Sequence, residues 1–111
     1  MKFRMATSLF AIALAFTVRP AAAQDAAAGA KVYTAQKCSV CHSIAGKGSK
    51  TNPLDGVGAK LSAADTKEWI VNPVEMTAKA KSTKKPPMPA KFKSLPAADV
   101  DALVAYMLSL K

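Results

Sequence analysis

The chain is 111 residues long and has 16 basic and seven acidic residues, two cysteines and one histidine. This length predicts a single small domain. Because both cysteines lie within one four-residue stretch and there is one histidine, the sequence excludes a disulfide-stapled fold and any site that needs two histidines.

Residues 1–23 have the pattern of a secretory signal peptide. Lys2 and Arg4 supply the positive start, residues 6–18 form an apolar run, and Ala21-Ala22-Ala23 offers a cleavage site of small residues. A transmembrane helix needs about 20 apolar residues, so this run is too short to span a bilayer comfortably. We expect export through the Sec pathway to the periplasm and cleavage after Ala23, which leaves residues 24–111 as one domain. An uncleaved N-terminal anchor is the alternative.

The mature part of the chain is strongly basic. Without Lys2, Arg4 and Arg19 it keeps 13 lysines and no arginine against all seven acids, a net charge of about +6. Such a surface suits nucleic acid, an anionic membrane or an acidic protein. Export, and the lack of arginine for bidentate contacts to phosphates or bases, argue against nucleic acid. We therefore expect an acidic protein partner.

The first helix is predicted over residues 25–37, with Asp25 as its N-terminal cap. Gly29 and Tyr33 lie four residues apart and so share a face of this helix. Glycine lowers the stability of a helix, and its presence indicates that another element packs closely against this face.

The motif Cys38-Ser39-Val40-Cys41-His42 follows this helix directly. Two cysteines separated by two residues and followed by histidine are typical of a c-type haem attachment site. Two thiols on one short turn can each form a thioether with one porphyrin, and the next residue can then reach the iron. We expect His42 to be an axial ligand. A CxxC disulfide with a histidine beside it by chance is the alternative.

Two segments that follow are predicted to be loops. Residues 43–60 are rich in glycine, serine, lysine and asparagine, and a bound haem would order such a long loop. Residues 76–93 are rich in lysine and proline, and the prolines around Met88 exclude a helix or a central strand there.

Two further helices complete the predicted all-α fold. One covers residues 62–71, capped by Ser62 and ended by Asn72-Pro73. The other covers residues 97–110, where apolar residues have the spacing of a buried helical stripe: Val100, Leu103, Val104, Met107 and Leu108. No segment shows sustained period-two alternation.

A six-coordinate haem needs a second axial ligand, and the methionines after residue 23 are Met76, Met88 and Met107. Met107 belongs to the apolar stripe, where a role in core packing is favoured. Met76 follows the helix stop at Asn72-Pro73. Met88 stands in the proline-stiffened loop among six lysines, at positions 79, 81, 84, 85, 91 and 93, and is the favoured ligand. A lysine ligand or an open position is the alternative.

The sequence resembles a small bacterial monohaem cytochrome c of the class I type. The resemblance runs through the mature chain in order: Gly29 and Tyr33, then the segments 38–42, 53–58, 69–73, 87–89 and 103–108. It implies about three to five short helices wrapped around one covalently bound haem c, with the N- and C-terminal helices crossing near Tyr106.

The resemblance also implies roles for single residues. Cys38 and Cys41 hold the haem, and His42 and Met88 are the axial ligands of its iron. The carbonyl of Pro53 accepts the Nδ1 proton of His42, and Trp69 packs against the haem and bonds a propionate. The implied function is that of a monomeric electron carrier between periplasmic or membrane-bound redox partners, and not of an enzyme.

Three alternatives stay open. A haem protein whose sixth position is vacant would bind or sense a small ligand, or act on peroxide. A thiol-disulfide redox protein would use Cys38 and Cys41, but the βαβ pattern of thioredoxin-like proteins is missing. A zinc site would need an acid beside Cys38, Cys41 and His42, and this spacing is unusual for zinc.

Overall fold

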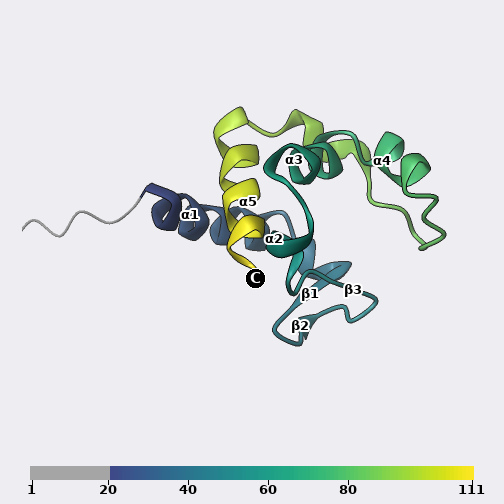
Figure 1. Cartoon of the computed structure of the whole chain (residues 1–111), viewed down its shortest axis with the longest axis horizontal. Helices are drawn as coiled ribbons and strands as arrows, with labels where there is room; N and C mark the ends of the chain where they lie inside the picture. Colours follow the sequence, from purple (N-terminus) through teal and green to yellow (C-terminus); the bar gives the residue numbers. More distant parts are fainter. Residues whose placement is uncertain (1–20) are drawn as a thin grey trace, which may run out of the picture.

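The computed structural model describes the backbone of residues 21–111 and the side chains from Asp25 onward. This part of the chain is mainly helical (Figure 1), which confirms the predicted fold class. Its helices are α1 (Ala21–Ala35), α2 (Val57–Lys60), α3 (Ala63–Val71), α4 (Pro73–Lys79) and α5 (Ala97–Ser109), with two short 3₁₀ helices, η1 (Cys38–Val40) and η2 (Ala90–Ser94).

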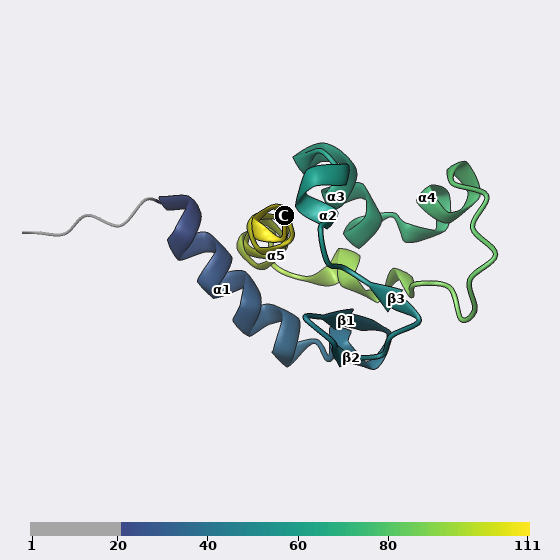
Figure 2. The same cartoon turned by 60° about the horizontal axis from the view of Figure 1, so that its bottom comes forward.

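Helices α1 and α5 cross and pack against each other, as predicted. The crossing is plain in Figure 1, and Figure 2 shows α5 nearly end-on beside α1. At the crossing Gly29 faces the backbone of Ala102 and the side chain of Tyr106, with no room for a larger residue. The rings of Tyr33 and Tyr106 meet edge to face, 5.7 Å apart between centroids. The predicted reason for a glycine in this helix is therefore confirmed.

The core lies between α5, α3 and η2. The predicted stripe of α5 is buried at Val100, Leu103, Val104 and Met107, while Leu108 is half-buried. Ile70 of α3, Phe92 of η2 and Tyr33 of α1 complete the cluster. Helix α5 packs against both α1 and α3, and η2 packs against α3, so α5 joins the two longer helices on one side of the core.

Helix α3 begins where the sequence predicts. The Ser62 side chain accepts a hydrogen bond from the Asp65 backbone N–H at 3.1 Å, and the helix ends before Asn72. The predicted loop after it is partly wrong, because Pro73 occupies the first turn of a new helix, α4, which contains Met76. Proline lacks only a donor that is unused in a first turn, so it can start one helix directly after ending another.

The predicted loop over residues 43–60 is also partly wrong. It contains a small sheet of β1 (His42–Ile44), β2 (Lys47–Gly48) and β3 (Asn52–Pro53), in the order β2-β1-β3. β1 is antiparallel to β2 and parallel to β3. Strands of two or three residues are too short to produce an alternating pattern in the sequence. The last four residues of the segment form α2.

The start of the first helix differs from the prediction. α1 begins at Ala21, so Asp25 lies inside the helix and does not cap it, because the alanines before it are strong helix formers. Most of the predicted signal peptide, residues 1–20, lies outside the described residues, so the signal and its cleavage stay predictions. Across residues 21–111 the structure has no helix that combines the length and the apolar character needed to cross a membrane.

Candidate haem site

The cysteine motif forms a tight turn after α1. Lys37 adopts a left-handed backbone (φ 56°) that ends the helix, and η1 follows at once. The Cys41 N–H donates to the Cys38 carbonyl at 3.1 Å, and the Ser49 N–H donates to the Ser39 carbonyl at 3.0 Å. Gly48 permits this second contact, since a Cβ there would lie 3.0 Å from the Ser39 oxygen. The small sheet therefore braces the motif from one side.

His42 is held by the pairing of β1 with β3. Its Nδ1 lies 3.0 Å from the carbonyl oxygen of Asn52, its partner in the parallel register. A carbonyl only accepts, so Nδ1 carries the proton and Nε2 is left with its lone pair. Burial lowers the pKa of His42, although the Asn52 carbonyl opposes this shift and the positive charge of Lys84 adds to it. The imidazole is therefore neutral at pH 7, the form that binds a metal.

The predicted role of Pro53 is wrong. The acceptor for His42 is the preceding residue, Asn52, because the strand register sets His42 opposite Asn52 and Ser43 opposite Pro53. Pro53 is also exposed and does not line the cavity. The sequence shows a proline near the expected place but does not fix the register of a two-residue strand.

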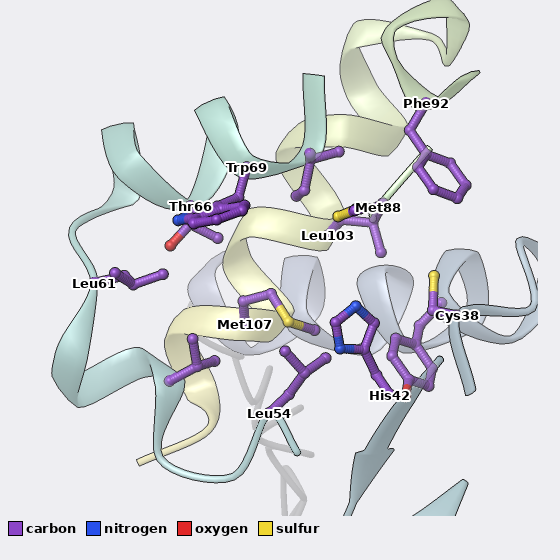
Figure 3. Close-up of a pocket in the computed structure, with 13 residues that line it drawn as sticks. Cys38, His42, Leu54, Leu61, Thr66, Trp69, Met88, Phe92, Leu103 and Met107 are labelled. Carbon is purple, nitrogen blue, oxygen red and sulfur yellow. The ribbon is translucent and has the colours of Figure 1, made fainter. Parts of the chain in front are cut away.

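His42 faces an apolar cavity of about 210 Å³ that opens into an outer hollow of about 520 Å³. Five side chains line both spaces, namely those of Cys38, His42, Trp69, Met88 and Phe92. Figure 3 shows the His42 ring and the Met88 sulfur in the inner cavity, with Met107 and Leu54 beside the ring. Together the spaces fall within the usual size of a cofactor site. Of the predicted site residues, Cys38, Cys41, His42, Trp69 and Met88 are brought together here.

The three methionines have different surroundings. Met88 is half-buried between the exposed residues Pro87 and Pro89 and lines both spaces. Met107 is 7 % exposed, belongs to the core cluster and also lines the inner cavity. Met76 lies on α4 and lines neither space. Geometry thus removes Met76 as a candidate and leaves Met88 and Met107.

The Cys38 thiol does not have the lowered pKa of a thiol that is active in disulfide exchange. Both cysteines are free and half-buried, and burial raises the pKa of the Cys38 thiol against the opposing charge of Lys91. Catalytic thiols of disulfide exchange have a lowered pKa, so Cys38 lacks the expected activation. Among residues 21–111 no three His, Cys, Asp or Glu side chains cluster to hold a metal ion, so the zinc alternative has no ligand set there.

Part of the cavity wall is formed by Phe92 and Tyr33, which the sequence does not predict as site residues. Phe92 is 7 % exposed and lines both spaces, although it stands in the segment predicted as a loop. Its signal in the sequence is that it is the single aromatic residue of the predicted loop over residues 76–93, with a lysine on each side. Tyr33, predicted as a helix-packing residue, also lines the inner cavity, and its buried hydroxyl has no hydrogen-bond partner. Burial raises the pKa of Tyr33 above its ordinary value, so this hydroxyl stays protonated and can donate a hydrogen bond.

The donor set fits a haem. An apolar cavity suits the porphyrin, two thiols stand on one turn at its wall, and a neutral imidazole nitrogen and a thioether sulfur face the interior. Haem would also cover the apolar walls that the protein alone leaves unfilled, which matters in a chain with so small a core.

Comparison with known proteins gives the same result. The family model described as Cytochrome c matches residues 26–111. No curated protein and no solved structure gave a significant match. The matched region contains the motif, both cavity-lining methionines and the crossing of the two terminal helices. The chain therefore belongs to the cytochrome c family, carries covalently bound haem c, and takes part in haem-based electron transfer.

Proposed function

We propose that this protein is a monomeric, monohaem electron carrier whose iron is held by His42 and Met88 and whose haem is attached through Cys38 and Cys41. The observation that supports this most directly is the bond from His42 Nδ1 to the Asn52 carbonyl, which leaves Nε2 facing a cavity that Met88 also lines. When bound, haem supplies an iron centre that accepts and releases one electron.

The surroundings of His42 favour its role as an axial ligand that stays in place. The Asn52 carbonyl orients the ring and raises its basicity, and both residues belong to paired strands. Since the ring is neutral and half-buried, little rearrangement is needed for it to bind a metal. A carrier gains from this arrangement because its ligands do not change between redox states.

Met88 is favoured over Met107 for the second axial position. Met107 is buried on α5 within the core cluster, whereas Met88 is half-buried at the edge of that cluster, in an exposed loop, and lines both spaces. A thioether opposite histidine raises the reduction potential, as do apolar walls that exclude water.

The rest of the chain supports a carrier and not an enzyme. It holds one histidine, which the proposal uses as a ligand, and its arginines all lie before residue 20. Residues 21–111 therefore contain no second imidazole and no guanidinium that could serve as a distal acid or base for chemistry on peroxide.

Absorption spectra of the haem-loaded protein test the ligand assignment. We expect a low-spin wild type with the methionine-to-iron band in the oxidised state, and loss of that band in Met88→Ala. Met76→Ala and Met107→Leu are the matched controls and should keep it. A high-spin wild type would support the alternative with an open sixth position, and loss of the band only in Met107→Leu would move the ligand to α5.

The outer hollow supports a docking face for an acidic redox partner in the periplasm. Lys37, Lys84 and Lys91 line it, and the six lysines around Met88 are all exposed. Val40, on the same rim, is 71 % exposed and offers an apolar contact. Positive charge around an apolar centre steers encounter with an acidic surface and gives short-lived complexes.

Electron-transfer rates with an acidic redox protein test the docking face. We expect the rate to fall as salt rises, and Lys91→Gln to reduce both the rate at low salt and its salt dependence. Lys60→Gln, at the end of α2 and away from the hollow, should have a smaller effect. Equal effects of the two variants would show that net charge matters and this face does not.

A further inference from the structure

Within residues 21–111, one long-range hydrogen bond joins the segment that carries Met88 to the rest of the structure. The Lys84 ammonium donates to the backbone carbonyl of Thr51 at 3.2 Å, across 33 residues of sequence. Within the described part of the chain, the other side-chain and turn hydrogen bonds of residues 80–89 join residues at most five apart, such as Ser82 N–H to the Thr77 carbonyl.

Thr51 is a significant anchor because of the residue that follows it. The Asn52 carbonyl accepts the His42 Nδ1 proton, and Asn52 begins β3, which pairs with the strand of His42. Lys84 therefore bonds to the peptide next to the one that orients His42. A single ammonium connects the segment of Met88 to the segment that positions His42.

Few other contacts hold the loop in place. Of residues 80–89, only Ser82 and Met88 are half-buried, and the rest are exposed. Among the described residues, the Lys84 ammonium donates this one hydrogen bond, whereas its neighbour Lys85 donates none. With so little packing, one hydrogen bond from a charged donor is a large share of what positions the loop.

We propose that Lys84 is a positioning residue that tethers the 80–89 segment to residue 51 and so keeps Met88 at the iron. The proposal rests on Met88 being the axial ligand. The tether limits how often the loop opens. An external ligand that must displace Met88 binds with an apparent affinity set by the open fraction.

Imidazole binding to the oxidised, haem-loaded protein measures this opening. We expect Lys84→Ala to raise the apparent imidazole affinity by about threefold to tenfold, the range given by loss of one hydrogen bond. Lys85→Ala removes the same charge from the same loop without removing a bond, and should stay near the wild type. Lys84→Arg keeps a donor and should restore most of the wild-type affinity.

Hydrogen exchange of the same proteins provides a readout that does not depend on the iron. We expect the amides of residues 80–85 to exchange faster in Lys84→Ala than in Lys85→Ala. Equal imidazole affinity and equal exchange in the two variants would overturn the tether. A wild type without the methionine-to-iron band would instead refute the Met88 assignment, and the exchange comparison would still decide whether Lys84 holds the loop.

Discussion

Replacing Gly29 by alanine tests how closely the two terminal helices must approach. A Cβ at this position would lie 2.6 Å from the Tyr106 Cβ and 2.7 Å from the Ala102 carbonyl carbon, and nearer still to the Ala102 oxygen. These neighbours belong to the backbone or are directly attached to it, so a change of rotamer cannot make room. Helices α1 and α5 would have to separate.

The expected effect is the sum of two opposing terms. Alanine favours the helix by about 1 kcal/mol over glycine. Overpacking in a rigid contact costs about 1–3 kcal/mol or more, and the upper end applies because backbone atoms block the space. We therefore expect Gly29→Ala to lose about 2 kcal/mol of unfolding free energy, which lowers the melting temperature by about 8–16 °C in a domain of this size.

Guanidinium unfolding of the haem-loaded protein, followed by circular dichroism, measures this loss. Ala28→Gly is the matched control, because Ala28 is exposed on the same helix and its replacement should cost only the propensity term of about 1 kcal/mol. If Gly29→Ala were as stable as the wild type or more stable, propensity would outweigh packing and the close approach of the helices would be refuted.

Three further predictions concern the site and its wall. His42 is the single histidine and burial lowers its pKa, so the unfolded chain takes up its proton first as the pH falls. The free energy of unfolding from denaturant titrations should therefore fall from pH 7.5 to 5.5, by at most about 1.4 kcal/mol per pH unit below 6.5, and equal free energies at both pH values would contradict this. Cys38→Ala together with Cys41→Ala should leave haem that acidic solvent extracts, whereas wild-type haem stays with the protein in mass spectra. Ser62→Ala should cost about 0.5–2 kcal/mol in urea unfolding, through loss of the cap on α3, and an unchanged midpoint would show that the cap is not needed.

The sequence predicted the features whose signals are local. The cysteine motif carries its own chemistry in five adjacent residues, the Ser62 cap needs only the N–H of Asp65, and the α5 stripe repeats every three or four residues. A glycine where a helix former is expected predicts a close contact on α1, and the resemblance to class I cytochromes c implies that the C-terminal helix makes this contact. Each of these depends on a pattern within one element.

The features it missed depend on contacts between segments. The acceptor for His42 is set by a strand register that two residues cannot encode, so the family resemblance implies Pro53 where the structure has Asn52. Pro73 helps to end α3 and is also the first residue of α4, and the sequence predicts only the first of these two roles. Phe92 gave no periodic signal because a short 3₁₀ helix carries it.

The two sides of the site are built with unequal rigidity. His42 lies on a paired strand, bonds to a neighbouring backbone carbonyl and directly follows the turn that holds both thiols. Met88 lies in an exposed segment whose one long-range hydrogen bond comes from Lys84. Because local opening follows the segments with the fewest buried contacts, loosening should begin on the Met88 side while His42 stays in place. The lysines proposed to face a partner also surround Met88, the proposed ligand, so docking and ligand retention would depend on one short stretch of the chain.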